Sequence, residues 1–436
     1  MELKNLLIRF VNKKIEQGTF INDHKSHENS FTRNRVLTFP IMFLLILRKS
    51  IKSLQLMLNE LFIHNHIART VSSSAYNQAR KKFKHTAFIE LNEGTIDLFY
   101  ENADIKRWKG YRVFGVDAST VILPKTKEIE DVYGSIKIKN KHLESSYTCA
   151  LFECRYDVLN HLAVQCSLNP GLSYEVDLGI KLLEESKKSI EKDLDIYDRG
   201  YASYEFFSHL VHKQKQFVVR ISRNSFKETR SLFSGIGPWN KIVTLKAPKD
   251  KKRELAEKNL PTSIEIRFVS VVLDTGEIEV LATSLIDAVI SRKEFKELYF
   301  LRWGVEGFYN LVKGRLNLEN FTGKSLESVQ QDFWSTIFIT NVETILTYET
   351  EKEINKNLND DQLPQKINKA VSFNAIKNLA FDIFFNKKDQ NNVEEKLTEL
   401  FRTGTIVQRK DRSLPRGKIS ARTSLNFQKR GRKHVF

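Results

Sequence analysis

The segment from Tyr299 to Lys313 constrains the chain most, because its polar and apolar residues separate when they are placed on a helix. At about 100° per residue, the polar residues that fall within an arc of roughly 60° are Tyr299, Arg302, Glu306 and Lys313. The apolar residues on the opposite side are Leu301, Val305, Phe308 and Val312. The pattern predicts one amphipathic helix that packs through its apolar side and presents the polar side.

The polar side of this predicted helix suits a phosphodiester substrate. Glu306 could hold a divalent cation, while Arg302 and Lys313 could neutralise phosphate oxygens. Tyr299 could donate a hydrogen bond to the same substrate. The alternative is a surface helix stabilised by ion pairs four residues apart. The glycines inside the segment, each of which costs about 1 kcal/mol in a helix interior, weigh slightly against that alternative.

The spacing Tyr-(2)-Arg-(3)-Glu-(6)-Lys resembles the signature of the DDE transposases of bacterial insertion sequences, specifically the insertion-sequence-four family. The downstream stretch Leu-Glu-Asn-Phe-Thr-Gly, residues 318–323, is also similar to that family. Members of the family have two further aspartates upstream of the glutamate. The resemblance covers roughly residues 35–345.

Two aspartates in the chain match the family's upstream positions. Residues 116–120, Val-Asp-Ala-Ser-Thr, resemble its first block, with Ala118 where glycine is usual. Residues 198–201, Asp-Arg-Gly-Tyr, resemble its second block. Asp117 and Asp198 each follow a short apolar, β-prone run, so we expect each to lie at a strand end. Taken singly, an aspartate in such a place is more often a turn or capping residue.

The resemblance implies an α/β fold with a ribonuclease-H-like catalytic core, a β-rich insertion and helical flanking regions. It implies that Asp117, Asp198 and Glu306 are the catalytic residues and hold Mg²⁺, for which Mn²⁺ can substitute. Two such cations about 4 Å apart would stabilise the attacking and the leaving oxygen of a DNA strand. No covalent enzyme intermediate is needed for this chemistry.

A helix predicted near the N-terminus carries side chains of the types that reach phosphates and base edges. It begins at the capping hydroxyls of residues 72–74 and runs to Lys84. We interpret it as a recognition helix, and a solvated basic face is the equal alternative. The residues expected to contact DNA are Tyr299, Arg302, Lys313 and Arg199 near the catalytic site, and Arg80, Lys81, Lys82 and Lys84 in this helix.

Periodicity divides the chain into segments of different character. Apolar residues recur at helical spacing in helices that Thr38, Ser53 and Ser325 can cap, and again in residues 365–386. Strand patterns dominate between residues 106 and 285, where residues 274–277 are expected to form a hairpin turn. The expected order is a helical DNA-binding domain (1–105), the catalytic core (106–215), a β-rich insertion (216–285), the rest of the core with the catalytic helix (286–345), a helical C-terminal region (346–401) and a basic tail (402–436).

Composition favours a nucleic-acid partner. The 436 residues include 70 Lys and Arg against 53 Asp and Glu, a net charge of +17 that attracts polyanions. A ribosomal or membrane-surface protein could have the same balance. The 3 cysteines form no Cys-x-x-Cys pair, which argues against a zinc ribbon. The most apolar run, Leu37–Leu47, is too short to span a membrane, so we expect a cytoplasmic, nucleoid-associated protein.

These observations predict a transposase that binds double-stranded DNA at the element ends, hydrolyses them and joins their 3′ ends to target DNA, as a homodimer in the DNA complex. One alternative is a non-catalytic DNA-binding protein derived from a transposase. Its weakness is that such a protein has no reason to keep the three carboxylates. A second alternative is a structure-selective nuclease on the same core.

Overall fold

The computed structural model describes residues 2–33, 35–49, 52–64, 70–140, 143–185, 192–235, 237–356, 358–359, 362–385 and 390–408. The chain folds into two compact units, each built from separate stretches of sequence. The first comprises Met1–Asp104, Ile122–Thr148 and Val312–Phe436, and the second comprises Ile105–Val121 and Cys149–Leu311. The chain therefore passes from one unit to the other several times.

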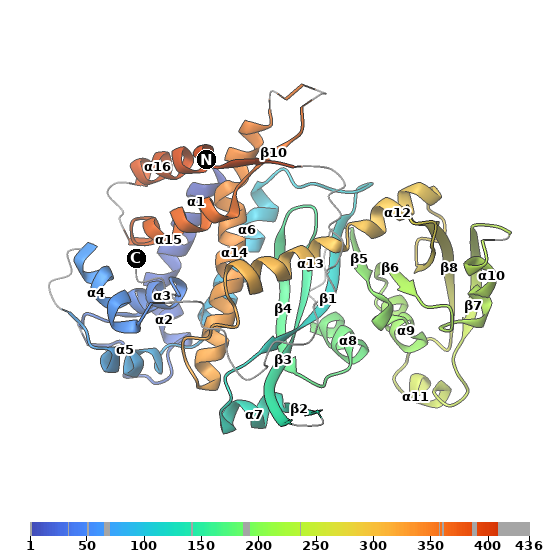
Figure 1. The fold of residues 1–436 in the computed structure, drawn as a ribbon, viewed down its shortest axis with the longest axis horizontal. Coiled ribbons are helices and arrows are strands. Elements are labelled where there is room, and N and C mark those ends of the chain that lie inside the picture. Colours follow the sequence, from blue (N-terminus) through green and yellow to red (C-terminus); the bar gives the residue numbers. More distant parts are fainter. Residues whose placement is uncertain are drawn as a thin grey trace. The chain divides into compact units, whose positions relative to one another are not determined.

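The second unit is built on a mixed sheet (Figure 1). Its strands are β1 (Arg112–Ile122), β3 (Leu143–Asp157), β4 (Leu162–Pro170), β5 (Asp193–Tyr197), β6 (Gln216–Ile221), β7 (Asn240–Lys246), β8 (Ser263–Val272) and β9 (Ile278–Thr283). The strand order is β3-β1-β5-β6-β9-β8-β7, and β4 pairs with β3. The pairs β1–β5 and β5–β6 are parallel, whereas β6–β9, β9–β8 and β8–β7 are antiparallel.

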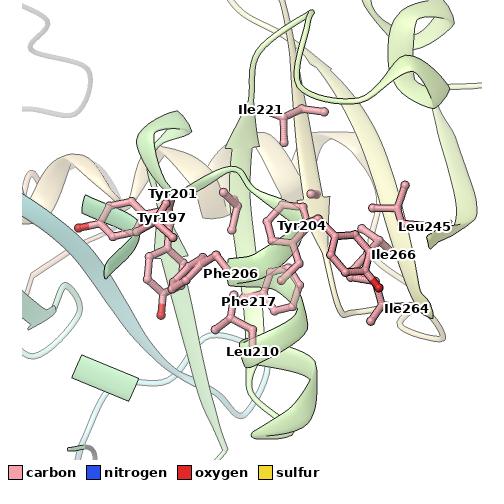
Figure 2. Close-up of a cluster of buried hydrophobic side chains, with 14 of the residues drawn as sticks. Tyr197, Tyr201, Tyr204, Phe206, Leu210, Phe217, Ile221, Leu245, Ile264 and Ile266 are labelled. Carbon is pink, nitrogen blue, oxygen red and sulfur yellow. The ribbon is translucent and has the colours of Figure 1, made fainter. Parts of the chain in front are cut away.

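Short helices accompany this sheet in the second unit. They are α8 (Glu175–Glu185), η1 (Arg199–Tyr201), α9 (Tyr204–His212), η2 (Lys227–Thr229), α10 (Arg230–Phe233), α11 (Lys252–Glu257), α12 (Arg292–Phe300) and α13 (Trp303–Asn310). α9 places Phe207 against β6, where its ring stacks on Phe217 at 5.6 Å. Figure 2 shows the surrounding buried cluster, to which β7 and β8 also contribute Leu245, Ile264 and Ile266.

The strands predicted between residues 216 and 285 are confirmed, including the hairpin turn at 274–277, but they do not form a sheet of their own. β6 pairs in parallel with β5, from Leu194↔Gln216 to Tyr197↔Val219. β9 then pairs with β6, and β8 and β7 follow. This segment therefore extends the sheet that carries β1 and β5. Burial of its apolar residues in the shared cluster of Figure 2 accounts for the extension.

β1 extends beyond the strand end that was predicted at Asp117. It continues without a break from Arg112 to Ile122. Residues 117–120 contain no glycine or proline, and Ser119 and Thr120 are compatible with an extended chain. Pairing with β5 nevertheless stops at Val116↔Tyr197. Asp117 and Asp198 are therefore the residues that immediately follow the last pair of two neighbouring parallel strands.

The single helix predicted for Tyr299–Lys313 is interrupted. α12 ends at Phe300, α13 begins at Trp303, and a π-helical turn, η3 (Leu311–Arg315), follows. Between the two helices the backbone hydrogen bonds join residues three apart instead of four, as in a 3₁₀ helix. For example, Arg302 N donates to the Tyr299 carbonyl at 3.1 Å. A Cβ atom on Gly304 would lie 3.0 Å from the Val158 side chain, so close packing on Val158 requires glycine there. Uniform helical spacing could not predict this contact.

The first unit is mainly helical. Its elements are α1 (Leu3–Glu16), α2 (Gly18–Asp23), α3 (Phe39–Leu47), α4 (Leu54–His64), α5 (Ser73–Arg80), α6 (Thr86–Asn102), α7 (Lys127–Tyr133), β2 (Ser135–Asn140), α14 (Leu326–Ile354), β10 (Gln365–Ile367), α15 (Lys369–Phe385), α16 (Gln390–Thr403) and β11 (Thr405–Val407). β2 pairs with the first half of β3. The long helix α14 packs against α1, α3 and α6. No helix in the described part of the chain is long and apolar enough to cross a membrane.

Several predicted helix starts are confirmed in this unit. Thr38, Ser72 and Ser325 accept backbone hydrogen bonds as N-caps of α3, α5 and α14. The helix predicted from residue 365 begins later, because 365–367 form β10, which pairs with β11 at 405–407. The start of the predicted unstructured tail is therefore ordered, and residues 409–436 lie outside the described residues.

The start of α12 gives a stability prediction. Ser291 and Glu294 form a reciprocal capping box, in which each side chain accepts a hydrogen bond from the other residue's backbone. Ser291→Ala should lower the free energy of unfolding by about 1 kcal/mol, the usual cost of losing such a cap. Urea denaturation measures the change. Thr275→Ala, in the exposed hairpin turn, is the control and should change it by less than about 0.5 kcal/mol.

Candidate active site

The carboxylates of Asp117, within β1, and Asp198, directly after β5, are oriented by their own backbone. Asp117 Oδ1 accepts a hydrogen bond from the Ala118 N–H at 2.9 Å, and Asp198 Oδ1 accepts one from the Arg199 N–H at 2.7 Å. Asp198 is also the N-cap of η1. The chain turns into η1 directly after the carboxylate, which leaves Asp198 at the rim of the sheet.

Arg302 lies among the predicted catalytic carboxylates. Its Nη2 is 3.0 Å from Glu306 Oε1, and its Nη1 is 3.8 Å from Asp117 Oδ2. The residue is only 2% exposed, and its Nε has no hydrogen-bond partner among the described residues. The Arg302 guanidinium therefore lies among carboxylates and away from solvent, and its predicted contact with DNA stays a prediction.

Burial and charge set the ionisation of the two aspartates in opposite directions. Burial raises the pKa of Asp117 to about 6, against the lowering effects of Arg302 and the Ala118 N–H, and the charges of Asp198 and Glu306 add to the rise. Burial also acts to raise the pKa of Asp198, but the Arg199 N–H, Arg302 and Arg220 outweigh it and lower that pKa. All three predicted carboxylates therefore interact electrostatically around one guanidinium.

Arg220 and Tyr309 belong to this site and were not predicted. Arg220 on β6 contacts Asp198 Oδ1 through Nη2 at 2.7 Å and Glu279 through Nη1 at 2.7 Å. The Tyr309 hydroxyl donates to the backbone oxygen of Asp117 at 2.6 Å. Arg220 is the one charged residue in the apolar run 217–221. This isolated charge is the feature of the sequence from which a role for Arg220 could have been predicted. Tyr309 lies in the predicted catalytic helix without a comparable signal.

A fourth carboxylate, Glu175 in the first turn of α8, lies beside η1. A Cβ atom on Gly200 would come within 1.8 Å of Glu175 Oε2, so glycine at this position makes room for the carboxylate. Burial, followed by the charge of Asp198, raises the pKa of Glu175. Nothing in the local sequence distinguishes Glu175 from the acidic residues common in first helical turns.

The other three residues predicted to contact DNA near the site are Tyr299, Arg199 and Lys313, and they lie in different surroundings. Tyr299 is buried, and its hydroxyl is 3.5 Å from Asp198 Oδ1. Arg199 is exposed on η1. Lys313 lies in the π-helical turn η3 and belongs to the first unit. The structure thus gathers Tyr299 with the aspartates and Arg302, while Arg199 faces solvent.

In the predicted recognition helix, α5 ends at Arg80, before the lysines. Arg80 is buried, and its Nη2 pairs with Asp332 at 2.8 Å on α14. Its Nε also donates to the Gln331 side chain at 2.7 Å. Its donors are therefore used inside the unit, and its predicted contact with DNA stays a prediction. Lys81 is exposed, and Lys82 and Lys84 are half-buried.

The donor chemistry of the site fits a hard divalent cation. Asp117, Asp198 and Glu306 offer only carboxylate oxygens, and their mutual repulsion, which contributes to the raised pKa of Asp117, is the kind that a cation relieves. Among the residues that the structure describes, no three His, Cys, Asp or Glu side chains are grouped tightly enough to hold a metal ion.

The mixed sheet thus carries an acidic site in which three carboxylates surround one buried arginine. The chain belongs to the transposase DDE domain family, since the family model matches residues 108–342, more than half of its length. The match includes Asp117, Asp198 and Glu306.

One solved structure that the chain resembles is the piggyBac transposase in a synaptic complex with hairpin DNA, determined by cryo-EM. The sequence identity is 11%, the similarity covers 91% of this chain and 81% of that chain, and the TM-score is 0.45. No curated protein matches the chain.

Proposed function

We propose that this protein is a transposase of the insertion-sequence-four family that binds terminal inverted repeats, hydrolyses the element ends and joins the 3′ ends to target DNA. The observation that carries the proposal is the contact of Arg302 with Glu306 and Asp117, beside Asp198. These residues come from three segments far apart in the sequence, and each occupies its position in the family pattern. The parallel strands β1, β5 and β6 support a ribonuclease-H-like core.

In this proposal Asp117, Asp198 and Glu306 hold divalent cations, Mg²⁺ or Mn²⁺. Such cations, when bound, activate a water or 3′-hydroxyl and stabilise the leaving oxygen. The rest of the site orients these ligands. Arg220 keeps Asp198 ionised and fixes its carboxylate from β6. Tyr309 fixes the backbone at Asp117 through its hydroxyl.

Arg302 has a different task in the proposed site. Before cations bind, its positive charge offsets the mutual repulsion of the carboxylates. Without this charge, burial would destabilise their ionised forms. Tyr299, whose ring lies 5.8 Å from the guanidinium carbon, keeps Arg302 and Asp198 together. Because Arg302 and Tyr299 are both buried, we assign both as positioning residues.

Double-stranded DNA is the proposed substrate, with element ends and target DNA bound by a homodimer in the nucleoid. The net charge of +17 and the exposed Arg199 and Lys81 support it. Lys82, Lys84 and Lys313 remain proposed phosphate contacts. The sixfold division of the chain into a helical DNA-binding domain, split core, insertion, C-terminal region and tail also remains a proposal.

An assay with two readouts tests the function. The full-length protein, Mg²⁺, a duplex ending in the inverted repeat that flanks the coding region, and a supercoiled plasmid are incubated together. We expect nicking at the repeat end and covalent joining of its 3′ end to the plasmid. Cleavage without joining would favour a nuclease, and specific binding without cleavage would favour a derived DNA-binding protein.

The basic tail gives a separate prediction. Residues 402–436 contain eleven Lys and Arg against one acid, Asp411. Each phosphate that such a side chain neutralises steepens the fall of log affinity with log salt by about 0.9. Removing residues 409–436 should therefore flatten the slope by several units, for repeat and random duplexes alike. Binding measured across a salt series checks this, and an unchanged slope would contradict it.

A further inference from the structure

The first unit contains a cavity of about 320 Å³ outside the candidate active site. It lies among the C-terminal end of α3, the segment that follows η3, and the helices α14 and α15. All of its lining residues belong to the first unit. Its volume falls in the range of roughly 300–1,000 Å³ that is usual for small-molecule sites.

The cavity wall is strongly basic. Its cations are Arg48, Lys49, Arg315, Lys369 and Lys377, and the described residues around it include no Asp or Glu. Lys49 and Lys369 are engaged, since Lys49 donates to the Leu318 carbonyl at 2.9 Å and Lys369 pairs with Glu343 at 2.5 Å. Arg48, Arg315 and Lys377 are the cations left for an anionic ligand.

Arg48 and Lys377 lie in surroundings that disfavour their own charge. The Nε of Arg48 is buried and has no hydrogen-bond partner in the described part of the chain. Burial lowers the pKa of Arg48, and burial with the positive charges of Arg48 and Lys52 lowers that of Lys377, in both cases against the charge of Glu60. Lys377 as a whole remains exposed to solvent. A bound anion would relieve both effects, because it supplies an acceptor and an opposite charge.

The rest of the wall suits a flat organic group. Phe373 contributes a half-buried aromatic ring, and Ile376 and Ala380 continue the apolar surface along α15. Asn320 and Asn374 add amides that both donate and accept hydrogen bonds. An aromatic surface with amides at its edge is the chemistry that holds an unstacked base.

We propose that this cavity binds one unpaired nucleotide of a DNA strand, with its phosphate on Arg48, Arg315 and Lys377 and its base against Phe373. The inference rests on the proposed function, because the nucleotide belongs to the DNA substrate. Arg315, which lines the cavity, lies two residues after Lys313 in the turn η3. The site would hold a strand end or an unpaired nucleotide near the repeat.

Calorimetry with the full-length protein in EDTA tests the site. The probes are thymidine 5′-monophosphate, thymidine and inorganic phosphate at equal ionic strength. We expect the nucleotide to bind more tightly than either fragment. Lys377→Ala and Arg48→Gln should weaken its binding about tenfold or more, the effect of losing a charge-assisted hydrogen bond. Lys396→Ala, an exposed lysine on α16, is the charge-matched control and should leave it within about twofold.

Two further results would overturn the assignment. Phosphate bound as tightly as the nucleotide would exclude a role for the base, and equal effects of Lys377→Ala and Lys396→Ala would exclude the cavity. A duplex with one unpaired 3′ thymidine must also compete with the mononucleotide better than a blunt duplex. Because these measurements need no metal and no cleavage, a protein that binds through Lys377 but never cleaves DNA would refute only the proposed function.

Discussion

Glu306→Gln, Asp117→Asn and Asp198→Asn should each reduce metal-dependent cleavage on the order of a thousandfold or more while repeat binding changes little. Each change removes one ligand charge and keeps the shape of the side chain. The amide oxygens can still accept the hydrogen bonds that the Ala118 and Arg199 N–H groups donate at 2.9 and 2.7 Å. The fold should therefore persist while the cation affinity falls.

Matched controls separate this effect from a general loss of negative charge. Glu297→Gln on α12 and Asp274→Asn in the hairpin turn remove exposed carboxylates that contact Lys293 and Lys296. Both should cleave at the wild-type rate. Thermal unfolding and repeat binding are measured for every variant. Substantial cleavage by any one of the three site variants would contradict the assignment of that carboxylate.

Arg80→Ala should lower the free energy of unfolding by about 3–5 kcal/mol, the usual cost of breaking a buried ion pair. The substitution leaves the Asp332 carboxylate without its ion pair. This carboxylate is 1% exposed, and among the described residues Thr322 donates its other hydrogen bonds. It also removes the donor to Gln331 at 2.7 Å. A cation used only for DNA would show no such loss.

Lys81→Ala is the matched control for Arg80→Ala, since it removes a neighbouring but exposed cation. It should change stability by less than about 0.5 kcal/mol and weaken DNA binding if α5 meets DNA. Urea denaturation and repeat binding are measured for both variants. Equal stability of the two would show that Arg80 is a surface cation after all.

Local signals in the sequence predicted much of the fold. Capping hydroxyls placed the starts of α3, α5 and α14, and alternation placed β6 to β9, because these patterns depend on nearby residues. The break between α12 and α13 was missed. Gly304, in the first turn of α13, packs against Val158, which lies 146 residues earlier in the chain, and helical spacing carries no signal of that contact.

The sequence singled out the three carboxylates that the structure brings around Arg302, but not the residues that support them. The order and flanks of Asp117, Asp198 and Glu306 were visible in the chain itself, whereas Arg220 and Glu175 reach Asp198 only through the fold. The burial of Arg302 and Arg80 was not predicted, because charge in a sequence carries no information about burial. Asp332, the partner of Arg80, is 252 residues further along the chain.

The discontinuous first unit has a consequence for synthesis on the ribosome. The apolar side of α6 packs against α14, which begins at Leu326 and ends at Ile354. The second unit has its whole sequence once Leu311 has been made. At about 5–20 residues per second, α14 is completed roughly 2 to 9 s later. During that interval the apolar side of α6 is not yet covered by α14. The nascent chain should therefore depend on chaperones that shield such surfaces.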